Sequence, residues 1–160
     1  MKSIQDFQVE VWYISVEGKI STPMPWQIQY DPKNHIVLIT ATGQISNDDA
    51  RAQVQEAVKL MKEHRTTRVL ADYSEGLTEV SLANLYWLVD FYKAVDAPPN
   101  FKGAVVLPHS GHRIEAYQFH TLAARNAGYN IRLFETRADA EKWLLEGTRG
   151  HAEPKPTTGK

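Results

Sequence analysis

Three short apolar runs, each followed by a longer segment of helical periodicity, constrain the fold of this 160-residue chain more than any other feature. The runs read "RVLADY", "KGAVVLP" and "NIRLFE". Continuous apolar runs of this length are typical of strands that are buried on both faces of a sheet. Strands that alternate with helices form a largely parallel sheet, because each helix carries the chain back to the same end of the sheet. The sequence therefore predicts an α/β fold.

Four segments have helical periodicity: residues 46–65, 80–95, 112–128 and 136–147. Ser46 is a good N-cap for the first, and Thr136, with an aspartate three residues later, has the spacing of a capping box for the last. Thr78 is expected to cap the second helix, and Gly128 is expected to end the third.

Two further strands precede the first helix. Trp26, Ile28 and Tyr30 alternate with glutamines, which is the period-2 pattern of a half-buried strand. The turn residues "DPKN" follow, and the continuously apolar run "IVLI" comes after them. This pair predicts an antiparallel hairpin at the N-terminal end of a mixed sheet. The expected order is β-β-α-β-α-β-α-β-α, with the helices packed on the sheet.

One domain accounts for most of the chain, because 160 residues suit a single core. Residues 1–22 are predicted to form an N-terminal extension with an extra strand, whose aromatic residues need cover from the domain or from a second chain. Residues 148–160, with two prolines and two glycines, are predicted to be a disordered tail. The domain itself is expected to span residues 23–147.

Composition excludes several classes of function. The chain has 18 basic and 19 acidic residues, so no basic excess exists to neutralise a nucleic-acid backbone. No cysteine is present, which excludes disulfides and thiolate metal sites. The N-terminus lacks the apolar region of a signal peptide, and no segment approaches the roughly 20 apolar residues of a membrane span. We therefore expect a cytoplasmic protein that binds no nucleic acid and does not insert into a membrane.

The order of elements resembles that of the STAS domain superfamily, and in particular of its SpoIIAA-like group. The stretches that carry the resemblance are "IVLITATGQISNDDA", "RVLADYSEG", "GAVVLP" and "NIRLFETRADAEKWL". The resemblance covers about residues 26–147. It implies a regulatory fold rather than an enzyme, which docks a protein partner: another protein, or a second copy of the chain in a homodimer.

The resemblance also implies a position for a phosphorylation switch. Classical STAS proteins carry an Asp-Ser-Ser-Gly motif at the start of the helix that follows the third strand, and a partner kinase phosphorylates one of its serines. If Asp72 matches the strand-end aspartate of the family, the motif falls at "VSLA", where only Ser81 is retained. Ser74 and Ser81 are the candidate phosphorylation residues. The alternative is that Ser74, Thr78 and Ser81 are turn and cap residues.

The helical segment 80–95 has a second apolar side. Leu82, Leu85, Tyr86 and Val89 are expected to face the sheet, whereas Trp87, Phe91 and Val95 fall on another side at i, i+4, i+8 spacing. These three residues are our candidate partner-binding residues, because aromatic side chains are favoured in interfaces. Two alternatives are cover from another helix or the N-terminal segment, and an aromatic slot for a small apolar ligand.

A polar loop after the strand "KGAVVLP" offers a second kind of site. His109, Ser110, His112 and Arg113 precede a helix, where backbone N–H groups and a guanidinium could hold an anion. A carrier or sensor of a small anionic or lipid-like ligand is therefore the alternative function. The other interpretation is that Ser110 is an N-cap and the loop a solvated connection.

Known catalytic and cofactor motifs are absent from the sequence. His112 and His120 lie eight residues apart, which is not the i, i+4 spacing of a helical metal pair, so no metal site is predicted. The G-x-S-x-G elbow of hydrolases and the glycine-rich phosphate-binding loops do not occur. The sequence predicts no catalytic residue and no cofactor.

Overall fold

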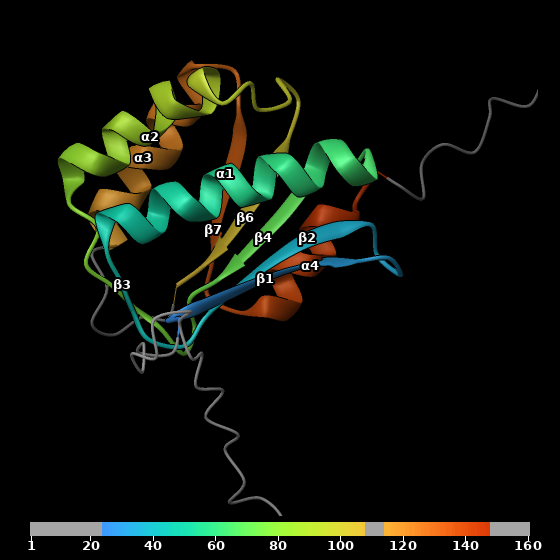
Figure 1. Ribbon diagram of the computed structural model, residues 1–160, viewed down its shortest axis with the longest axis horizontal. Helices are drawn as coiled ribbons and strands as arrows, with labels where there is room; N and C mark the ends of the chain where they lie inside the picture. Colours follow the sequence, from blue (N-terminus) through green and yellow to red (C-terminus); the bar gives the residue numbers. More distant parts are fainter. Residues whose placement is uncertain (1–23, 108–113, 148–160) are drawn as a thin grey trace, which may run out of the picture.

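The computed structural model describes residues 24–107 and 114–147 (Figure 1). The predicted extra strand in residues 1–22 and the predicted tail at 148–160 lie outside these residues. The strands are β1 (Trp26–Asp31), β2 (Ile36–Ala41), β3 (Gln44–Ile45), β4 (Arg68–Asp72), β5 (Leu77–Thr78), β6 (Lys102–Val106) and β7 (Asn130–Phe134). The helices are α1 (Asn47–His64), α2 (Leu82–Ala94), α3 (Ile114–Asn126) and α4 (Arg137–Leu145).

Five strands form the main sheet in the order β1-β2-β4-β6-β7. Strand β1 pairs antiparallel with β2, and the remaining neighbours pair in parallel, as the sequence predicts. Each parallel crossover steps in the same direction across the sheet. Because such crossovers share one hand, the helices α1, α2 and α3 must all lie on one face of the sheet. Figure 1 shows this layer, with α4 on the opposite face.

Alternate residues of the inner strands supply two separate cores. In β2, Val37 and Ile39 pack under α1, α2 and α3, whereas Ile36 and Leu38 point to the other face. This second core is completed by Ala140, Trp143 and Leu144 of α4 and by Leu70, Ala104 and Val106 of the sheet. The continuous apolar runs are therefore explained, because strands with helices on both faces need apolar residues at every position.

A small second sheet lies beside the main one and was not predicted. Strands β3 and β5 pair in parallel, so Thr78 is a buried strand residue. The predicted cap is therefore wrong: α2 begins at Leu82, and Ser81 is its N-cap. The chain approaches itself closely here, since a Cβ on Gly76 would lie 2.8 Å from the Cβ of Ala41.

The other predicted helix ends are confirmed. The side chains of Ser46 and Thr136 accept hydrogen bonds from the backbone N–H groups three residues later, as N-caps do. After α3, Gly128 takes a left-handed φ of 93°, a conformation that glycine adopts without steric cost. Among the described residues, no helix is long and apolar enough to cross a membrane.

Candidate functional site

The carboxyl ends of β4 and β6 lie side by side, where the sequence places its polar loops. The backbone N–H of Tyr73 donates to the carbonyl of Val106 over 3.0 Å. Asp72 is buried at this edge, accepts a hydrogen bond from the Ser74 N–H over 3.0 Å and lies 3.8 Å from Arg137 of α4. The carboxylate therefore ties the loop and α4 to the end of the sheet.

The predicted anion site lies outside the described residues. His109, Ser110, His112 and Arg113 all fall in the gap at 108–113, so their arrangement stays a prediction. Within the described ranges on either side of this gap, no group of three or more histidines, aspartates and glutamates could hold a metal ion.

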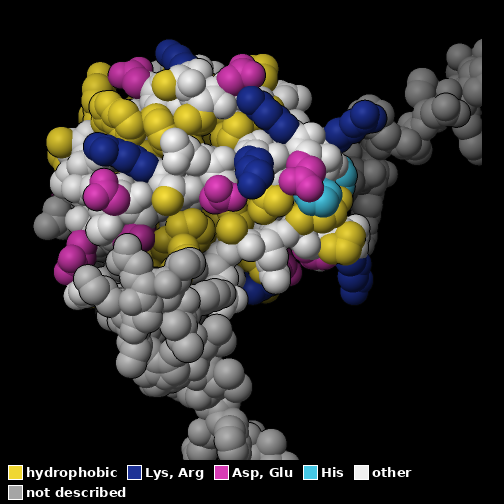
Figure 2. All heavy atoms as spheres, in the orientation of Figure 1, with side chains coloured by type: hydrophobic (Ala, Val, Ile, Leu, Met, Phe, Trp, Pro, Cys, Tyr) yellow, Lys and Arg dark blue, Asp and Glu magenta, His cyan; other side chains and the backbone are white. Residues whose placement is uncertain are grey.

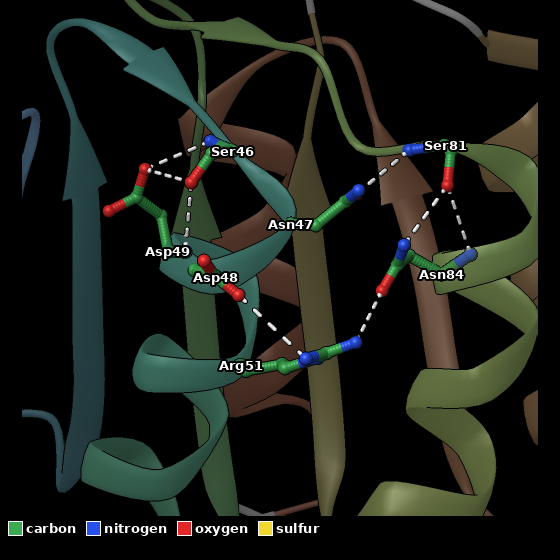
Figure 3. Close-up of polar contacts among 7 residues, drawn as sticks. All are labelled: Ser46, Asn47, Asp48, Asp49, Arg51, Ser81 and Asn84. Carbon is green, nitrogen blue, oxygen red and sulfur yellow. Dashed lines mark hydrogen bonds and ion pairs between the residues drawn. The ribbon is translucent and has the colours of Figure 1, made fainter.

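A polar network joins the N-terminal ends of α1 and α2 (Figure 3). The N–H of Ser81 donates to the side chain of Asn47 over 3.1 Å, and the Ser81 hydroxyl accepts from the N–H of Asn84 over 3.2 Å. Arg51 of α1 donates to the Asn84 side-chain oxygen over 3.1 Å and also lies 3.7 Å from Asp48. The interpretation of Ser81 as a helix cap is therefore confirmed, and the residue sits where two helix N-termini meet.

Replacing Ser81 by alanine should lower the free energy of unfolding by about 1 kcal/mol, because the hydroxyl that caps α2 is lost. Replacement by aspartate should cost less than half of this, since a carboxylate also caps and favours the helix N-terminus. Urea denaturation of the two variants beside the unaltered protein measures both values. Equal losses of unfolding free energy in the alanine and aspartate variants would show that the capping hydrogen bond contributes nothing to stability.

The stripe of predicted partner-binding residues lies along α1. The guanidinium of Arg51 stands 4.4 Å from the ring of Trp87, which in turn stacks on Phe91 with centroids 4.7 Å apart. Phe91 and Val95 are half-buried against the core, whereas Trp87 keeps 40% of its surface exposed. Of the three residues, Trp87 offers the most surface to a partner.

The most exposed apolar residues of α2 and α3 lie outside this stripe. We call Leu82, Tyr86, Phe119 and Leu122 the α2–α3 face. Tyr86 is 58% exposed and stacks on Phe119 with centroids 6.2 Å apart. The prediction that Leu82 and Tyr86 face the sheet is wrong.

The buried positions of α2 explain this error. They are Leu85, Leu88, Val89 and Tyr92, which recur at i, i+3, i+4 and i+7. Tyr86 follows Leu85 by one residue and is turned about 100° away from it. Beside Tyr86, a groove of about 390 Å³ runs between α2 and α3, with Asp90, Lys93 and Asn126 among its lining residues.

His120 links α2 to α3 beneath this face. Its Nδ1 lies 2.6 Å from the carbonyl oxygen of Leu85, and because a carbonyl can only accept, Nδ1 carries the proton. The Nε2 atom then accepts from the hydroxyl of Tyr92 over 3.0 Å. Burial lowers the pKa of His120, and the bond to Leu85 opposes this only in part. His120 is thus a neutral structural connection between the helices rather than a metal ligand.

The chain is similar to a known family and to solved structures. The family model described as SpoIIAA-like matches residues 36–145. One similar solved structure is an uncharacterized protein of the DUF3478 family with a SpoIIAA-like fold from Shewanella loihica PV-4, at 17% identity and a TM-score of 0.45, covering 74% of this chain and 91% of that chain. A second is the anti-sigma factor antagonist SpoIIAA in its unphosphorylated form, at 11% identity and a TM-score of 0.48, covering 76% of this chain and 98% of that chain. No curated protein matches the chain. Because the matched model spans more than half of the 160 residues, the resemblance stated from the sequence is confirmed, and the chain belongs to the SpoIIAA-like family.

Proposed function

We propose that the protein is a regulatory domain without catalytic activity that docks a protein partner on its α2–α3 face. One observation carries this proposal. The described residues include seven exposed large hydrophobic side chains, and four of them belong to this face. Scattered apolar residues are normal on a protein surface, but a cluster of this kind is a mark of an interaction site. The SpoIIAA-like family membership supports a regulatory role broadly.

The chemistry of the face suits an amphipathic helix of the partner. Figure 2 shows hydrophobic side chains gathered over α2, with charged side chains at their border. The groove between α2 and α3 can receive apolar side chains spaced along one side of a partner helix. Asp90 and Lys93 supply charges of both signs beside it, as a polar rim does. Tyr86 is of a residue type that contributes strongly to binding in protein interfaces.

Ser81 lies directly before Leu82, the first residue of the face. A phosphate on Ser81 would be accepted by the N-terminus of α2, and it would add negative charge at the edge of the docking surface. Ser74 lies on the exposed connection between β4 and β5. We therefore place the regulatory modification at Ser81 rather than at Ser74, and the intact mass of protein from its own source checks for the phosphate.

The docking face is tested by replacing Tyr86 with glutamate. Co-purification from the source cells followed by quantitative mass spectrometry identifies the partner, and calorimetry with the purified partner gives Kd. We expect Tyr86→Glu to weaken binding at least tenfold, because a carboxylate would be desolvated in an apolar interface.

The matched control is Leu77→Glu, since Leu77 is exposed on β5 and does not belong to the face. Both variants should keep the melting temperature of the unaltered protein within a few degrees, and only the Tyr86 variant should lose binding. Light scattering separates a homodimer from a partner of another kind. Equal affinities for both variants, or a monomer that retains no protein at all, would contradict the proposal.

A further inference from the structure

A cavity of about 100 Å³ lies between the main sheet and the layer formed by α1, α2 and α3. Most of its lining is aliphatic or aromatic, from Val54, Ala57 and Val58 of α1, Leu88 of α2, and Ile39 and Val69 of the sheet. It lies inside the domain, beneath the helices whose outer sides form the α2–α3 face, and none of the four residues of that face lines it. The cavity is therefore a separate site from the proposed docking surface.

One polar group in this lining has an unused hydrogen-bonding capacity. Gln53 of α1 is 2% exposed, and its Oε1 accepts a hydrogen bond from the hydroxyl of Tyr73 over 2.6 Å. Its Nε2 atom has no hydrogen-bond partner within the described part of the chain. A buried amide donor without a partner is costly, so such a group in a cavity wall indicates an absent acceptor.

The other polar groups of the lining are already paired or carry no charge. His120 and Tyr92 bond to each other, and His120 uses its second nitrogen on the Leu85 carbonyl. No lysine, arginine, aspartate or glutamate lines the cavity. Burial raises the pKa of Tyr117 to about 12 and that of Tyr73 well above its ordinary value, so both phenols stay neutral near pH 7. A charged ligand would find nothing to balance its charge here.

We propose that this cavity binds a small uncharged molecule that is mainly apolar and carries one hydrogen-bond acceptor, held by Nε2 of Gln53. A carbonyl or ether oxygen is the chemistry that fits. The volume sets the size, because an engineered apolar cavity of about 150 Å³ is known to admit benzene. Benzene has six heavy atoms, so the ligand of this smaller cavity has on the order of four heavy atoms.

Two probes of nearly the same shape test the proposal. Acetone carries the acceptor and has four heavy atoms, whereas 2-methylpropene replaces its oxygen by a CH₂ group. Titration of the ¹⁵N-labelled full chain, followed by two-dimensional NMR, should show saturable shifts at amides of lining residues in α1, α2 and the sheet. Acetone should bind at least tenfold more tightly than 2-methylpropene, and this comparison on the unaltered chain needs no variant.

Two variants locate the site. Gln53→Met combined with Tyr73→Phe removes the amide donor together with the phenol hydroxyl that would otherwise be freed to donate, so this double variant should abolish the preference for acetone while 2-methylpropene still binds. Ala57→Leu places a larger side chain in the cavity wall and should abolish the binding of both probes. Melting temperatures confirm that each variant is folded.

Four results would overturn the proposal, and the first three concern the probes. They are the absence of saturable shifts with either probe, equal affinity of the unaltered chain for the two probes, and shifts confined to residues outside the cavity. The fourth is a water molecule that gives a persistent NMR cross-peak to the Gln53 amide at saturating acetone, because the cavity would then be a hydration site.

Discussion

Replacing Leu144 by alanine should lower the free energy of unfolding by about 3–4 kcal/mol. The side chain is fully buried in the second core, where α4 covers one face of the sheet. Because α4 is the only described helix on that face, no neighbouring helix can move in to fill the space, and the cavity should persist. Urea denaturation monitored by tryptophan fluorescence measures the change.

Leu122→Ala is the matched control, since it makes the same chemical change on a helix but at a residue that is 53% exposed. We expect it to change the free energy of unfolding by less than about 0.5 kcal/mol. A similar loss in both variants would mean that α4 is not packed on the sheet as the structure has it.

Replacing His120 by leucine should destabilise the domain by about 3 kcal/mol, because two buried groups lose their partners. These groups are the carbonyl of Leu85 and the hydroxyl of Tyr92. Tyr92→Phe removes only one of the two bonds and should cost about 1 kcal/mol in thermal or urea unfolding. If the double variant, His120→Leu with Tyr92→Phe, is no less stable than His120→Leu alone, the two residues act as one unit.

The same residue should give the stability a pH dependence. Burial places the pKa of folded His120 below the unfolded value of about 6.5, so the unfolded chain binds the proton more readily. The contribution of His120 to the free energy of unfolding should therefore fall as pH decreases from about 6.5 towards the folded pKa. Above pH 7 this contribution should not rise further. His120→Leu should lack this part of the decline, so the stability difference between the two proteins should shrink in acid. A difference that stays constant from pH 8 to 5 would contradict this.

Most of the sheet could be predicted from the sequence because each strand has a period or a continuous apolar run that only burial explains. Strands β3 and β5 could not, since two residues each are too short to show a pattern. Sequence periodicity also does not reveal which face of the sheet α4 covers. The buried residues of α4 show that this helix packs on the sheet, but they do not show on which face. The shared hand of the crossovers places α1, α2 and α3 on one face, so α4 covers the other.

The candidate site was predicted less well, and the reason is geometrical. Helix α2 is apolar on most sides, so its sequence does not distinguish the buried Leu85 and Leu88 from the exposed Leu82 and Tyr86. A signal did exist in α3. Tyr117, His120 and Ala124 occupy its buried side, which leaves Phe119 and Leu122 exposed on an outer side.

The strand order bears on how the domain is assembled during synthesis. From β1 to β7 each strand of the main sheet pairs with the one made before it, so the emerging chain can extend the sheet without waiting for a distant segment. The second core is different, because Leu38, Leu70 and Val106 stay uncovered until Leu144 has left the ribosome. The nascent domain therefore passes through a stage with three helices in place and one apolar sheet face bare, which is the surface a chaperone would meet.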